Sequence, residues 1–188
     1  MIKKNILVAA LMLAGIALSA SASAQTYVAA TVGQAKVDAD CTGVTNCKTS
    51  DTTVKLLGGY NFTQNLGVEA GYFSLGKATA SVGGIAGEFK ATGVDVVGVV
   101  KSTPSNGWVG FGKVGIAYIR AESTVNSATI KGTVTKNSTK PVFGLGATYQ
   151  ISNNVNVRAE YERRQVNVVD GVSDATVSNF SVGVEYIF

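Results

Sequence analysis

The feature that most constrains this chain is a series of alternating segments in which every second residue is apolar. The last of them, "TVSNFSVGVEYIF" (176–188), shows the pattern clearly. Successive side chains of a β-strand point to opposite faces, so each segment predicts a strand with one apolar and one polar face. Glycine and small polar residues separate eight such segments. The predicted strands are Tyr27–Val37, Thr52–Phe62, Leu66–Leu75, Phe89–Ser102, Trp108–Ala121, Lys140–Ser152, Val155–Val166 and Thr176–Phe188.

Short and long connections alternate along the chain. The short ones are 63–65, 103–107 and 153–154, and the long ones are 38–51, 76–88, 122–139 and 167–175. Antiparallel strands place alternate connections at opposite ends of a sheet, so one end carries tight turns and the other carries loops. This asymmetry predicts an all-β fold, an eight-stranded antiparallel up-and-down transmembrane β-barrel with periplasmic turns and extracellular loops.

The direction of the apolar faces separates a membrane barrel from a soluble β-sandwich. A sandwich turns its apolar face inward, whereas a membrane barrel turns it toward lipid and lines its interior with the polar face. Aromatic residues near the strand ends of the apolar faces are typical of the girdles at a membrane interface. They are Tyr60, Phe62, Tyr72, Trp108, Tyr118, Tyr149, Tyr161, Tyr186 and Phe188. After residue 24 no apolar stretch of about 18 residues occurs, which excludes an α-helical membrane protein.

The first 24 residues have the three parts of a secretory signal peptide. Lys3 and Lys4 come first, an apolar run follows from Ile6, and "ASA" closes the segment at residue 24. The run has about 13 residues, whereas a transmembrane helix needs roughly 20. We therefore expect a cleaved signal peptide over 1–24 and a barrel domain over 25–188. Without Lys3 and Lys4 the net charge falls from +4 to +2, which is too small to indicate a nucleic-acid partner.

Two cysteines, Cys41 and Cys47, lie in the first long connection. An exported protein meets an oxidising compartment, and the two residues are close enough to pair, so we expect a disulfide. The alternative is a metal site. It is weaker, because two thiols do not fill a tetrahedral zinc site and the chain contains no His. No metal and no cofactor is expected.

At this point the chain resembles the OmpA-like transmembrane barrel family. The resemblance runs through "GGYNFTQNLGVEAGY" (58–72), "ATGVDVVGVV" (91–100), "GFGKVGIAYIRAES" (110–123), "VFGLGATYQISNNVNVRAEYERR" (142–164) and "SVGVEYIF" (181–188). It implies a monomeric barrel in the bacterial outer membrane with both termini on the periplasmic side. Larger members carry a further peptidoglycan-binding domain, which we expect this chain to lack. The final strand, with Gly183, Tyr186 and Phe188, resembles the signal that the outer-membrane assembly machinery reads.

Charged residues recur on the polar faces of the predicted strands. We expect them inside the barrel, and they are Lys55, Glu69, Asp95, Lys113, Arg158, Glu160, Glu162 and Glu185. Eight strands enclose an interior only wide enough for side chains, and an unpaired buried charge is costly, so these groups are expected to pair. They form either a network that fills the lumen or a selectivity or gating network.

The family's interior holds paired charges, and this sequence matches that pattern only in part. Glu69 and Arg158 match one carboxylate–guanidinium pair. Val99 and Thr148 stand where the family has a Lys and a Glu, so the resemblance implies one pair without the second.

The sequence argues against an enzyme. Small outer-membrane barrels include lipid A deacylases, lipid A palmitoyltransferases and omptin-type proteases, each of which relies on a catalytic His, and this chain has none. The stretch "GYFSLGKA" (71–78) begins like a phosphate-binding loop, but Ala78 replaces the required Ser or Thr.

The expected function is structural, in envelope integrity, with exposed loops. The alternatives are a narrow porin-like channel for small solutes and a surface adhesin. Lipid and the anionic lipopolysaccharide are the expected partners. The connection "ESTVNSATIKGTVTKNST" (122–139), with its two lysines, is a candidate for that contact.

Overall fold

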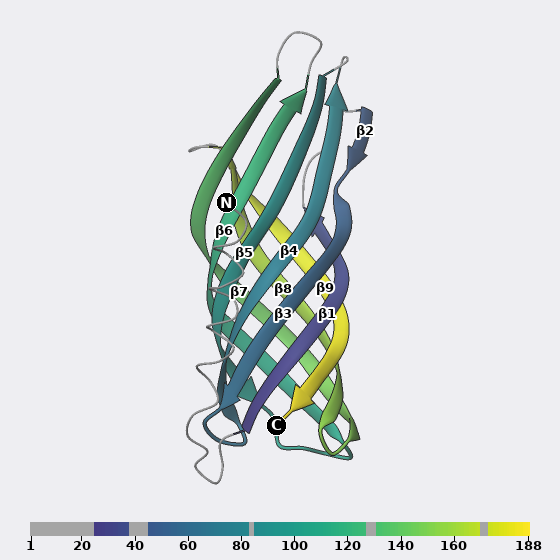
Figure 1. Cartoon of the computed structure of the whole chain (residues 1–188), viewed down its shortest axis with the longest axis vertical. Helices are drawn as coiled ribbons and strands as arrows, with labels where there is room; N and C mark the ends of the chain where they lie inside the picture. The colour runs from purple at the N-terminus through teal and green to yellow at the C-terminus, as the bar shows by residue number, and fades with distance from the viewer. Residues whose placement is uncertain (1–24, 38–44, 83–84, 127–130, 170–172) are drawn as a thin grey trace.

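The computed structural model describes residues 25–37, 45–82, 85–126, 131–169 and 173–188. In these residues nine antiparallel strands form one sheet, and eight of them close into a barrel (Figure 1). The pairings β1–β9 and β4–β5 complete the ring. The strands are β1 (Gln25–Val37), β2 (Thr45–Lys48), β3 (Ser50–Asn61), β4 (Leu66–Val82), β5 (Ile85–Lys101), β6 (Trp108–Asn126), β7 (Lys131–Ser152), β8 (Val155–Val169) and β9 (Ser173–Ile187). The described part of the chain has no helix long and apolar enough to span a membrane.

Burial alternates along the strands in the predicted sense. In β9, Asn179, Ser181 and Glu185 are buried in the interior. The outward residues of the same strand, among them Phe180, Val182 and Val184, are about half exposed. The apolar face of β9 therefore points away from the barrel, and the prediction of an eight-stranded antiparallel barrel is confirmed. The interior is polar only in part, because other strands also turn apolar residues such as Ile119 and Val142 inward.

The predicted strand ends on the long-connection side were wrong, because most of the expected loops are strand. The β6–β7 hairpin continues from Ala121↔Lys136 to Asn126↔Lys131. The segment expected as loop 76–88 pairs as far as Val82↔Ile85. Thr and Val favour extended backbone, and a hairpin outside the ring can carry polar residues on both faces. The polar sequence of these segments therefore predicted loops, although their backbone pairs as strand.

The first long connection also contains a strand that was not predicted. β2 pairs with the upper part of β4 outside the eight-stranded ring. The predicted disulfide lies in this region. Cys41 and the side chain of Cys47 fall outside the described residues, as does the whole predicted signal peptide 1–24, so both stay predictions.

Pro141 marks the point where the ring of strands opens between β7 and β8. β7 pairs with β8 from Val142↔Arg164 toward the C-terminal end of β7. Proline has no N–H to donate and is confined to strand edges. Among the described residues, β7 above this point pairs with β6 only, so β2, β4, β5, β6 and β7 form an open sheet that rises above the barrel (Figure 1).

The opposite end of the barrel carries tight turns and the C-terminus (Figure 1). Asn106 and Gly107 have φ values of 49° and 82°, and Ser105 pairs with Trp108. Two successive residues with positive φ define the turn that best matches the twist of a hairpin, and Asn-Gly is its preferred sequence. The turn closes the connection between β5 and β6, and one extra residue on the β5 side separates its Ser105–Trp108 bridge from the Lys101↔Phe111 pair.

Candidate functional site: the barrel interior

The interior has two parts that follow one another along the barrel axis. Charged side chains occupy the part nearer the short turns and the middle of the barrel. Apolar side chains close the end beneath the open sheet. The change is visible along single strands: Lys113 of β6 is followed by Ala117 and Ile119, and Asp95 of β5 is preceded by Ala91 and Phe89. We call these parts the charged part and the apolar part of the lumen.

Arg158 is the centre of the charged part. Its Nη1 lies 2.8 Å from Glu69 Oε1 and 3.0 Å from Glu185 Oε2, and its Nε lies 2.9 Å from Glu160 Oε2. Tyr27 donates a hydrogen bond of 2.7 Å to Glu69. The guanidinium also lies over the Phe111 ring, 4.3 Å from its centroid. One cation thus pairs with three carboxylates from three strands.

Two lysines link this cluster to the middle of the barrel. Lys113 Nζ lies 2.8 Å from Glu160 and 2.7 Å from Glu162. Lys55 Nζ lies 2.7 Å from both Asp95 and Glu162. Glu162 is therefore shared by two lysines and connects the two clusters into one network. The structure brings all eight of the predicted interior charges together.

Arg164 is an interior charge that the predicted set left out. It forms an ion pair with Glu162, lies 3.6 Å from Asp95, and stacks over the Phe73 ring at 4.0 Å. The alternation of β8 contained the signal, because Arg158, Glu160 and Glu162 continue to Arg164 at the same period. Four cations and five carboxylates are buried in the network. Among the described residues, no group of His, Cys, Asp or Glu side chains is arranged to hold a metal ion.

Glycines leave the space that the long side chains need. A Cβ at Gly144 would lie 2.7 Å from Cε of Lys113, and one at Gly71 would lie 2.9 Å from Cε of Lys55. Each lysine therefore lies across a glycine of a neighbouring strand. The glycines of the polar faces are part of the site rather than mere turn signals.

The two positions that depart from the family pattern are both buried in the wall. Val99 and Thr148 face the interior and supply no charge there. The expectation of one ion pair alone was too narrow, since Arg158 has three carboxylate partners and the lysines add five further ion pairs. Charges at other positions replace the second pair of the family.

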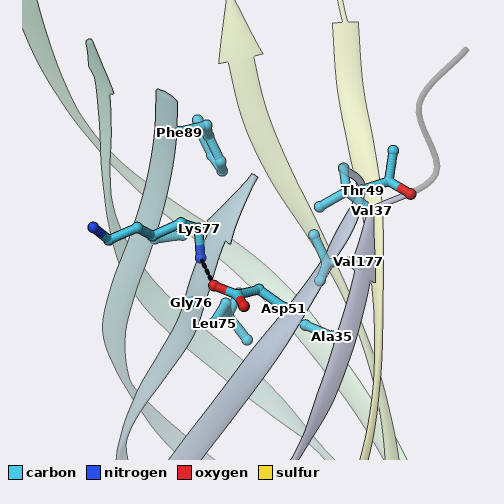
Figure 2. Close-up of a pocket in the computed structure, with 10 residues that line it drawn as sticks. Ala35, Val37, Thr49, Asp51, Leu75, Gly76, Lys77, Phe89 and Val177 are labelled. Atoms are coloured by element: carbon cyan, nitrogen blue, oxygen red, sulfur yellow. Dashed lines mark hydrogen bonds between the residues drawn. The ribbon is translucent and has the colours of Figure 1, made fainter. Parts of the chain in front are cut away.

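The apolar part closes the lumen at the end beneath the open sheet. Ile119, Val142 and Val177 are fully buried there. Figure 2 shows a small hollow at this end, which Val177 helps to line together with residues of β1, β3, β4 and β5. At its rim the N–H of Lys77 donates a 2.7 Å hydrogen bond to Asp51 Oδ2, next to Gly76 with φ 73°. The stretch that begins like a phosphate-binding loop is thus a bulge within strand β4, and strand rather than helix follows it.

The predicted assembly residues lie at the opposite end. Tyr186 and Phe188 point outward with their ring centroids 5.1 Å apart, and the Phe188 side chain is 70% exposed. The N–H of Phe188 donates to the carbonyl of Thr26 at 3.0 Å. Gly183 pairs with Thr31 and faces the interior, whereas the two rings lie on the outer surface.

A model of the OmpA-like transmembrane domain matches residues 21–188. The chain belongs to this family. The fold is shared with Neisserial surface protein A (17% identity, 87% of this chain and 97% of that chain, TM-score 0.65). It is shared with Ail of Yersinia pestis (18% identity, 88% and 98%, TM-score 0.54) and with the N-terminal barrel domain of Pseudomonas aeruginosa OprF (15% identity, 87% and 97%, TM-score 0.52). A comparison with curated protein sequences found no match.

Family and geometry agree on the location of this OmpA-like protein. It is a small outer-membrane β-barrel, and its outward apolar band, with residues such as Leu56, Ile116 and Leu145 more than half exposed, faces lipid. The short-turn end is the periplasmic end, as in other bacterial outer-membrane barrels. The open sheet is therefore extracellular.

Proposed function

We propose that this OmpA-like barrel is a structural component of the outer membrane whose lumen does not conduct. The observation that carries the proposal is the continuous network from Arg158 through Lys113 and Glu162 to Lys55. A conducting path through it would separate several buried ion pairs. Breaking one such pair leaves an uncompensated charge and costs about 3–5 kcal/mol. The apolar part adds a second obstacle to a hydrated ion.

The proposed partners are the lipids of the outer membrane, including lipopolysaccharide, and the machinery that assembles barrels. The outward band supplies the contact with acyl chains. The proposal includes export by the signal peptide 1–24, a Cys41–Cys47 disulfide and a monomeric barrel. It includes no catalytic role, because the chain has no His to act as a base near neutral pH.

The envelope role is tested in a deletion strain. We expect the strain to admit hydrophobic antibiotics and detergents more readily than the parent, and the wild-type gene to restore the barrier. A strain whose barrier is unchanged by the deletion would contradict the proposal.

The assembly role of the ending is tested by deleting Phe188. We expect normal synthesis and export but reduced insertion, measured as the fraction of the protein that migrates as the folded form on an unheated gel. Tyr60→Ala is the matched control, because it removes an outward aromatic near the same end of the barrel and leaves the final strand unchanged. Normal membrane levels after loss of Phe188 would rule out this use of the final strand.

Adhesion is a second candidate, supported by the extracellular sheet. From Lys131 to Pro141, β7 pairs with β6 and presents its other edge above the barrel. An exposed strand edge is a template for an added strand. The structure of Ail, an attachment invasion locus protein, was solved with a heparin analogue and shares this fold. A variant in which a tight turn replaces residues 124–133 separates the two candidates. If the role is structural, this variant should restore the barrier of the deletion strain; if the protein is an adhesin, the variant should no longer bind to cells.

A further inference from the structure

The outward charges above the lipid-facing band divide into two groups. On the β4–β6 side the cations have acidic partners: Lys90 Nζ lies 3.0 Å and Lys77 Nζ 3.7 Å from Glu88 Oε1. Arg120 Nε lies 3.3 Å from Glu122. On the β8–β9–β1 side, Lys36 and Arg163 are exposed and have no ionic partner among the described residues. Among the described residues, each cation of the β4–β6 side thus has an acidic partner, whereas Lys36 and Arg163 have none.

Lys36 and Arg163 flank one serine. The strand register pairs Ser178 with Lys36 of β1 on one side and with Arg163 of β8 on the other. Side chains of directly paired residues are neighbours on the same face of a sheet. All three lie between inward residues, since Ala35, Val177 and Glu162 beside them are buried. Two cations and a hydroxyl therefore share one small outward patch.

The hydroxyl of Ser178 is oriented by a neighbour. Tyr161 donates a 3.0 Å hydrogen bond to Ser178 Oγ. A serine hydroxyl has one proton and two acceptor positions, so accepting this bond leaves its own proton available to a ligand. The patch then offers one neutral and two charged donors, which suits an anion with several oxygens.

The position of the patch along the barrel axis indicates which kind of molecule would carry that anion. Tyr161 and Phe180 lie two residues toward the membrane from Arg163 and Ser178, and Val182 follows. Phe180 and Val182 are 58% and 46% exposed on the lipid-facing surface. Aromatic residues mark the membrane–water interface of such barrels. A group bound here is thus at headgroup level, with apolar surface directly below it for acyl chains.

We propose that Lys36, Ser178 and Arg163 form a binding site for a phosphate group of an outer-leaflet glycolipid, with its acyl chains along Phe180 and Val182. The site deepens the proposed contact with lipopolysaccharide and rests on it. Lys77, Lys90 and Arg120 are excluded from the site because each already has an acidic partner in Glu88 or Glu122.

The test compares two double variants of the refolded full-length mature barrel. Lys36→Gln with Arg163→Gln removes the unpaired cations, and Lys77→Gln with Lys90→Gln removes the same charge from the paired side. Binding of bisphosphorylated lipid A, and of the same lipid A without its phosphates, is measured by native mass spectrometry. Migration on an unheated gel shows that each variant is folded.

Wild-type protein is expected to bind the phosphorylated form at least about tenfold more tightly, as one charged hydrogen bond implies. The first variant loses this preference, the control keeps it, and Ser178→Ala weakens binding about threefold. Equal losses in both double variants, or none in the first, would overturn the site while leaving general lipid contact intact. Displacement of lipid A by millimolar inorganic phosphate would also overturn the glycolipid assignment. If no form of lipid A binds, the proposed lipopolysaccharide contact fails as well.

Discussion

The charged and the apolar parts of the lumen fill the same narrow space by different chemistry. In the charged part the side chains are held by directional ion pairs, as Arg158 is by its three carboxylates. In the apolar part, residues such as Ile119 and Val142 fill volume without directional contacts. The charged part therefore depends on its ion pairs, and the apolar part depends on close packing. Substitutions on the two sides of this boundary should fail in different ways.

The largest effect is expected at the centre of the charged part. Arg158→Met leaves Glu69, Glu160 and Glu185 without their shared cation, and we expect the free energy of unfolding to fall by about 3–5 kcal/mol. The measurement is equilibrium unfolding in urea, followed by the fluorescence of Trp108. Arg163→Met is the matched control, because Arg163 is exposed on the same strand and its loss should cost less than about 1 kcal/mol. Equal losses in the two variants would contradict the network.

A somewhat smaller effect is expected in the apolar part. Ile119→Ala removes a fully buried side chain and leaves a cavity, which costs about 2–4 kcal/mol. Ile116→Ala on the same strand faces lipid and leaves no enclosed cavity, so we expect a clearly smaller loss. The same urea titration checks both. A greater loss at Ile116 than at Ile119 would show that the apolar part is loosely packed.

The rim of the apolar part gives a third prediction. Gly76 has φ 73°, and an added Cβ would lie 2.8 Å from Asp51 Oδ2, so Gly76→Ala should cost about 1–2 kcal/mol. Gly112→Ala is the control, since a Cβ there has nothing within 4 Å and the backbone is ordinary strand. Urea midpoints that agree for the two variants would remove the strain argument at the rim.

The smallest effect lies outside the lumen, on the paired side of the outer surface. The hydrogen bond from Lys90 and the charge of Lys77 hold the pKa of Glu88 below its ordinary value. This interaction is present at pH above the ordinary pKa and is lost as the pH falls through the lowered one. Carboxyl NMR should find Glu88 titrating below its usual range, and Lys90→Gln should raise that value. A titration unaffected by Lys90→Gln would disprove the pairing.

Much of the fold was predictable because alternation is local. The inward and outward faces of β7, β8 and β9 follow from every second residue, and the Asn106–Gly107 turn follows from its φ requirement. The extracellular ends were not predictable in the same way. Polar hairpins in water lack an apolar face, so only the pairing partner, such as β6 for β7, shows where the strand ends.

The interior site was predictable as a set of residues but not as a network. Alternation places Glu162 inside, yet its contacts with Lys55 and Lys113 depend on the register between strands far apart in sequence. The same alternation also places Arg164 inside the barrel, but the predicted set left out this residue, which lies near the predicted end of its strand. That Lys36 and Arg163 have no acidic partner among the described residues could not be predicted, because the sequence does not give the positions of the outward acidic groups.

The central claim is that both parts of the lumen close it, and single-channel conductance in a planar bilayer tests that claim most directly. The folded barrel should give no large, stable openings, and Arg158→Met should not create a wide pore while the apolar part stays packed. Large, stable openings of the wild-type protein, comparable to those of general porins, would contradict the account.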